Sequence, residues 1–121
     1  MNGLIYVVDY ERIIAETSST ILKRSGFNAI PFFNAPDALK AAEMQRPDVF
    51  ISNVIMPEMN GIKACISIKA LYPTCKIFLV SGLEFDAPLL QDARNKGHDF
   101  HFLQKPVRPT HLLAAIQQAL Q

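Results

Sequence analysis

Five short apolar runs alternate with five segments of helical periodicity, and this alternation limits the folds open to the chain. Strands are expected over 4–8, 27–33, 49–53, 76–80 and 100–103, and helices over 11–25, 34–45, 62–71, 86–96 and 109–120. The first run, Leu4 to Val8, is apolar throughout, which is typical of a strand buried on both faces. Strand and helix alternating in this way predict an α/β fold with a parallel sheet between two layers of helices.

Length and composition favour one domain and exclude several classes of protein. The 121 residues are enough for a single domain over 1–121, and 50% apolar with 19% charged residues excludes intrinsic disorder. A net charge of +1 without a basic block argues against direct binding to nucleic acid or to an anionic membrane. No apolar stretch reaches the length of a membrane span, and no secretory signal is recognisable. We therefore expect a cytoplasmic protein whose two cysteines, Cys65 and Cys75, are reduced and partly buried.

Local signals fix some of the element boundaries. Asn34 precedes Pro36 and Asp37, a pattern that predicts the start of a helix with Asn34 as its cap. Pro31 cannot donate a hydrogen bond within a sheet, so the second strand is expected at an edge. Gly26 is expected to end the first helix.

Polar residues follow four of the predicted strands where each strand ends. These residues are Asp9, Asn53, Ser81 and Lys105, the last of which lies in Gln104-Lys105-Pro106. In an open parallel sheet the binding crevice lies beyond the carboxyl ends of the strands. The sequence therefore predicts that an acid, an amide, a hydroxyl and an ammonium group converge on one crevice.

Four motifs, in order along the whole chain, carry a resemblance to a known family: Val7-Val8-Asp9, Asn-Val-Ile-Met-Pro-Glu-Met-Asn-Gly over 53–61, Ser81-Gly82 and Lys105-Pro106. Together they resemble the receiver domain of two-component response regulators. The resemblance implies a (βα)5 flavodoxin-like three-layer sandwich with strand order 2-1-3-4-5. It also implies a histidine kinase that phosphorylates an aspartate after the third strand, with help from a divalent cation. A hydroxyl at Ser81 and the ammonium of Lys105 would bind phosphoryl oxygens, and Lys105-Pro106 would be a cis peptide.

Two departures from the family pattern determine the functional hypothesis. Asn53 stands at the position of the phosphorylated aspartate, and a carboxamide lacks the carboxylate nucleophile that this chemistry needs. Tyr10 stands where the family usually has a second metal-binding acid. We therefore hypothesise a degenerate pseudo-receiver that has no metal site, binds Mg²⁺ weakly or not at all, and has no enzymatic activity. Glu11 is expected to begin a helix, with service as a substitute metal ligand as the less favoured alternative.

The remaining pocket residues lead to further expectations. Lys105 is predicted to contact Asp9 or Asn53 directly, in the space that a metal and phosphate would use. Phe102 matches the family's switch aromatic, although packing of this ring against a neighbouring helix is slightly preferred. Leu83 and Phe85 are candidates for an apolar partner patch. The expected partner is a protein, namely a histidine kinase, an output domain or another signalling protein, and a homodimer is a further option.

Two other functions compete with this hypothesis. The first is a conventional phosphorylated receiver in which the acceptor aspartate has been mutated to Asn53, although Tyr10 argues against it because such a mutation would not require both changes. The second is a flavin-binding domain of flavodoxin type at the same crevice. Such a domain would need a small, hydroxyl-rich phosphate loop after the first strand, and the sequence there, Asp-Tyr-Glu-Arg over 9–12, is bulky and charged.

Overall fold

The computed structural model describes residues 3–82, 87–98 and 100–121, and their core is a parallel sheet of five strands. The spatial order of the strands is β2-β1-β3-β4-β5, and every neighbouring pair is parallel. The predicted fold class and strand order are both confirmed. The strands are β1 (Leu4–Val8), β2 (Asn28–Phe32), β3 (Val49–Asn53), β4 (Lys76–Ser81) and β5 (His101–Gln104).

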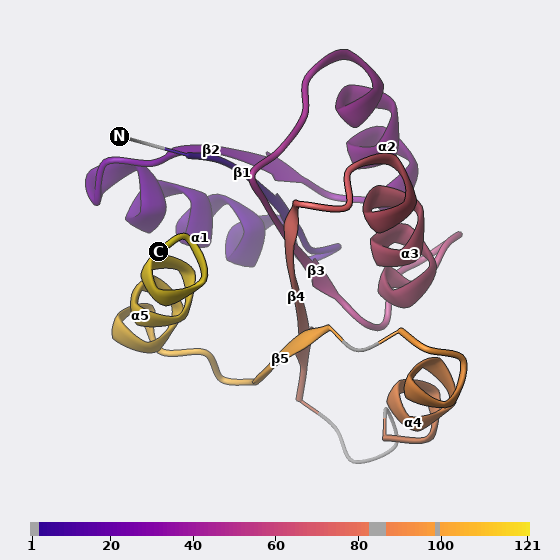
Figure 1. Ribbon diagram of the computed structural model, residues 1–121. Coiled ribbons are helices and arrows are strands. Elements are labelled where there is room, and N and C mark those ends of the chain that lie inside the picture. The colour runs from indigo at the N-terminus through magenta and orange to yellow at the C-terminus, as the bar shows by residue number, and fades with distance from the viewer. Residues whose placement is uncertain (1–2, 83–86, 99) are drawn as a thin grey trace.

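Five helices cover the two faces of this sheet (Figure 1). One layer contains α1 and α5, and the other contains α2, α3 and α4. Their bounds lie within two residues of the predicted ones, and Glu11 precedes the first helix as its cap residue. The helices are α1 (Arg12–Arg24), α2 (Ala35–Met44), α3 (Gly61–Leu71), α4 (Ala87–Asn95) and α5 (Pro109–Ala119).

The apolar strand β1 separates two hydrophobic cores. Tyr6 and Val8 point into the core beneath α2 and α3, whereas Ile5 and Val7 point into the core beneath α1 and α5. Side chains of successive strand residues alternate between the two faces of a sheet, so a strand covered by helices on both sides must be apolar throughout. The prediction of burial on both faces is confirmed, because all five residues of β1 are buried.

Polar side chains set where two helices of one layer, α2 and α3, begin. Asn34 Oδ1 accepts a hydrogen bond from the backbone N–H of Asp37 at 2.8 Å and caps α2 as predicted. Asn60 Oδ1 accepts one from the backbone N–H of Lys63 at 2.9 Å and caps α3. Each cap satisfies a donor that the first turn of a helix leaves unpaired. The start of α3 is thereby fixed next to the carboxyl end of β3.

The edge strand, the two cysteines and the lengths of the helices also bear on the sequence predictions. The strand that contains Pro31 lies at an edge of the sheet, as predicted. Cys65 and Cys75 are free thiols and both are buried. Burial raises the pKa of the Cys75 thiol to about 11. Among the helices that the structure describes, none is both long and apolar enough to cross a membrane.

Candidate functional site

Three buried polar side chains meet at the carboxyl edge of the sheet. Asp9 follows β1, Asn53 ends β3 and Ser81 ends β4, and their exposed fractions are only 5%, 6% and 4%. β1 pairs with β3 and β3 pairs with β4, so the three residues lie on adjacent strands. The structure therefore brings together the acid, the amide and the hydroxyl that the sequence placed at one crevice.

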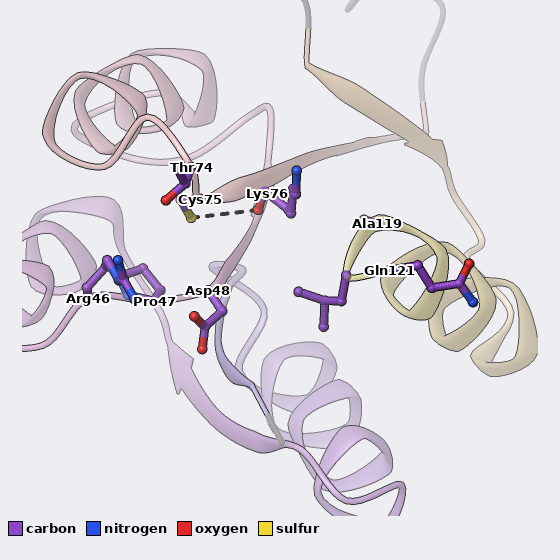
Figure 2. Close-up of a pocket in the computed structure, with 9 residues that line it drawn as sticks. Arg46, Pro47, Asp48, Thr74, Cys75, Lys76, Ala119 and Gln121 are labelled. Carbon is purple, nitrogen blue, oxygen red and sulfur yellow. Dashed lines mark hydrogen bonds between the residues drawn. The ribbon is translucent and has the colours of Figure 1, made fainter. Parts of the chain in front are cut away.

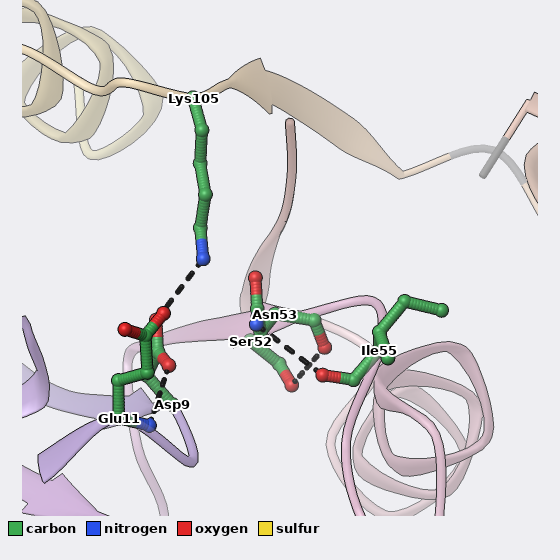
Figure 3. A network of polar contacts seen from close by, with 6 residues as sticks. All are labelled: Asp9, Glu11, Ser52, Asn53, Ile55 and Lys105. Atoms are coloured by element: carbon green, nitrogen blue, oxygen red, sulfur yellow. Dashed lines mark hydrogen bonds and ion pairs between the residues drawn. The ribbon is translucent and has the colours of Figure 1, made fainter. Parts of the chain in front are cut away.

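The fourth predicted residue, Lys105, joins this group through Asp9. Its Nζ lies 3.5 Å from Asp9 Oδ2 (Figure 3), and the Lys105 side chain is 27% exposed. The backbone N–H of Lys105 donates to the carbonyl oxygen of Ser81 at 2.9 Å, which fixes the lysine next to the end of β4. The expected direct contact of Lys105 is present, with Asp9 as the partner, and the Lys105-Pro106 peptide is cis as the resemblance implied.

The Asp9 carboxylate also has a partner in its own segment. Its Oδ1 accepts a hydrogen bond from the backbone N–H of Glu11 at 2.9 Å. Asp9 is therefore held between a backbone donor on one oxygen and an ammonium group on the other. Such pairing offsets the free energy that a carboxylate loses when burial removes its hydrating water.

Asn53 is held by contacts that sequence reasoning missed. Its Nδ2 donates to the backbone carbonyl oxygen of Ile55 at 3.3 Å (Figure 3). The backbone carbonyl oxygen of Asn53 accepts a hydrogen bond from Ser52 Oγ at 3.0 Å. The contact with Ile55 depends on the path of the loop after β3, in which Glu58 has a left-handed φ of 66°. The only sequence signal near them was the Asn-Gly pair over 60–61, which marks a turn but does not specify its partners.

Gly61 allows α3 to begin directly against Asn53. A Cβ atom on Gly61 would lie 1.8 Å from the backbone oxygen of Asn53, far inside van der Waals contact. The N–H of Gly61 donates to the carbonyl oxygen of Val54 at 2.8 Å, which closes the loop onto the strand. Only glycine therefore fits at this close approach between loop and helix.

The other predicted site residues do not join the buried group. Tyr10 is 48% exposed, and Glu11 caps α1 without a side-chain hydrogen bond and is itself exposed. Phe102 is 42% exposed on β5, and both the packing of its ring against a helix and its role as a switch aromatic stay predictions. β5 is an edge strand, and an edge strand leaves such a side chain with fewer neighbours. Leu83 and Phe85 lie outside the described residues.

A comparison with protein families decides which family this crevice belongs to. The sequence profile of the family described as the response regulator receiver domain matches residues 5–117. The chain belongs to this family. Its five parallel strands in the order 2-1-3-4-5, with five helices, form the receiver fold.

Curated relatives and solved structures agree with this receiver assignment. The chain is 31% identical over 118 residues to the DNA-binding transcriptional regulator NtrC of Proteus hauseri, covering 98% of this chain and 24% of the relative. It is 31% identical over 124 residues to the alkaline phosphatase synthesis transcriptional regulatory protein PhoP of Bacillus subtilis, covering 100% and 50%. The chemotaxis response regulator CheY4 of Vibrio cholerae superimposes with a TM-score of 0.83 at 25% identity, covering 98% and 99%. This receiver chain spans about a quarter of the length of NtrC and half of the length of PhoP.

The donors of this receiver crevice can be tested against the divalent cation that the family implies. The carboxylate of Asp9 is already in contact with Lys105, and the nearby oxygens are the neutral amide of Asn53 and the carbonyl of Ile55. Across the described parts of the chain, no three histidine, cysteine, aspartate or glutamate side chains are placed to hold a metal ion. Magnesium is bound through carboxylates in octahedral geometry, so this donor set fits Mg²⁺ poorly.

Proposed function

We propose that this chain is a receiver module that is not phosphorylated at position 53 and acts as a non-enzymatic, cytoplasmic protein-interaction module. The observation that carries the proposal is Asn53, which is buried at the end of β3, where the family pattern places its acceptor aspartate. An acyl phosphate forms when a carboxylate oxygen attacks phosphorus. The amide is neutral, and its oxygen is a much poorer nucleophile.

The electrostatics of the crevice support the same proposal. The carboxylate of Asp9 is the one buried acid of the group, and Lys105 neutralises it at 3.5 Å. Tyr10 replaces a second acid with an exposed phenol. A site that holds Mg²⁺ needs a surplus of negative charge, and these three residues leave none.

The proposed partner is a protein of a signalling pathway, namely a histidine kinase, an output domain or another signalling protein. The curated relatives are longer than this chain, which suggests that receivers of this kind work next to further domains. An apolar patch at Leu83 and Phe85 and self-association through it remain proposals about a segment outside the described residues. In this scheme the module offers a constant surface to its partner rather than a switched one.

Incubation with acetyl phosphate and Mg²⁺, followed by intact-mass measurement, tests the loss of phosphorylation. We expect no added phosphate on the natural chain and one added phosphate on the double variant Asn53→Asp/Tyr10→Asp. A phosphate mapped to Asn53 in the natural chain would contradict the proposal.

The single variants separate the two departures. If Tyr10 contributes to the loss, Asn53→Asp alone gains phosphate more slowly than the double variant, and Tyr10→Asp alone gains none. Equal rates for the single Asn53→Asp and the double variant would favour the alternative function, a conventional receiver whose acceptor aspartate was mutated to Asn53.

A further inference from the structure

A small cavity lies at the opposite end of the sheet, where the strands begin. Its volume is about 150 Å³, and its walls come from the segment before β3, the segment that leads into β4 and the end of α5 (Figure 2). The polar part of its lining comes from Arg46, Asp48, Thr74, Cys75, Lys76 and Gln121. We propose that this cavity is a binding site for a small oxyanion, a phosphate or a carboxylate.

The charges around the cavity favour an anionic ligand. Arg46 and Lys76 line it, and in the described parts of the chain no ion pair involves either side chain. Lys69 does not line the cavity, but it is a third cation close to the wall, because its Nζ donates to the backbone oxygen of Cys75 at 3.1 Å. The single acid, Asp48, is turned to the backbone, where its Oδ2 accepts from the N–H of Leu4 at 2.8 Å. Three side-chain cations therefore lie in or beside the cavity wall, against one side-chain carboxylate, that of Asp48.

The buried thiol of Cys75 lies among the same charged side chains. Lys69, Arg46 and Lys76 each lower the pKa of this buried thiol and Asp48 raises it, although burial is the largest influence. Four charged groups thus act on one point of the wall. An anion at that point would be attracted by three of them.

The size of the cavity limits the class of ligand. A phosphate, a phosphate monoester head group or an acetate-sized carboxylate fits a cavity of this volume. The Thr74 hydroxyl offers a neutral donor beside the two cations.

Amide chemical shifts during titration with inorganic phosphate at constant ionic strength test the site. We expect a saturable response of the backbone amides at Thr74, Cys75 and Lys76. Each of the single variants Arg46→Gln and Lys76→Gln should weaken this response about tenfold, the effect of losing one charge-assisted hydrogen bond, and the double variant should weaken it further. A parallel titration with acetate distinguishes the sources of the oxyanion, because a carboxylate site would respond to acetate as strongly as to phosphate.

The variant Lys40→Gln is a matched control, since it removes one exposed cation of α2 that does not line the cavity. It should leave the response unchanged. The proposal would be overturned by no saturable response to either anion, by an equal loss in Lys40→Gln, or by shifts confined to the crevice of Asp9 and Lys105. Because this site lies at the other end of the sheet, its failure would leave the proposed function untouched.

Discussion

Replacement of Gly61 by alanine should destabilise the fold strongly, because the new methyl group would meet the backbone of the candidate site. Its Cβ would lie 1.8 Å from the carbonyl oxygen of Asn53 and 2.8 Å from Ser52 Oγ. Real Cβ atoms stay beyond 3 Å, so the start of α3 must move by more than 1 Å. That movement breaks the Gly61–Val54 hydrogen bond and weakens the Asn60 cap of α3.

The expected loss of unfolding free energy for Gly61→Ala is about 3–5 kcal/mol, from overpacking together with the lost hydrogen bond and cap. Urea unfolding followed by circular dichroism measures it. Gly3→Ala is the matched control, because the nearest atoms to its Cβ lie at 3.5 Å, an ordinary contact. The control should change the unfolding free energy by less than about 0.5 kcal/mol. A loss of under about 1 kcal/mol in Gly61→Ala would refute the reasoning about this close approach.

Three further predictions concern single interactions. Lys105→Met should lower the unfolding free energy by about 1 kcal/mol at low salt, because Asp9 loses its countercharge. The difference from the natural chain should shrink in high salt. An unchanged midpoint of urea unfolding at low salt would contradict this prediction. Asn34→Ala should lower the free energy of unfolding in urea by about 1 kcal/mol, because α2 loses its cap. An exposed substitution such as Lys40→Ala should leave this free energy nearly unchanged. Burial raises the pKa of the Cys75 thiol to about 11 from 9.0. The stability contributed by the protonated thiol is therefore constant below about pH 9 and is lost between pH 9 and 11. Cys75→Ser should flatten that part of the pH profile of the unfolding free energy measured in urea.

Much of the fold could be predicted because its signals are local. The alternation of apolar runs with helical segments gave the elements, and Asn34 marked the start of α2 within one residue. The uniform apolar character of β1 predicted the two helical layers before any contact was known. Strand order is different, because it depends on contacts between segments far apart in the chain, and it came from the resemblance to a family.

The candidate site was predictable only in part, for a physical reason. Asp9, Asn53, Ser81 and Lys105 could be placed because each follows a strand, and parallel strands end at one edge. The contact of Asn53 with Ile55 could not be predicted, because the carbonyl of Ile55 is positioned by the dihedral angles of an irregular loop. The exposure of Phe102 was also missed, since a strand at the edge of a sheet and one in its centre can have the same residue pattern.

A titration with Mg²⁺, followed by the backbone amide shifts of Asp9, Asn53 and Lys105, tests the central claim most directly. We predict no saturable shift in the natural chain, because Asp9 is paired with Lys105 and residues 10 and 53 carry no negative charge. The variant Asn53→Asp/Tyr10→Asp should show a saturable shift at the same amides and is the positive control. Saturable Mg²⁺ binding at these three amides in the natural chain, with an affinity similar to that of the variant, would contradict the claim that the crevice has lost its cation site.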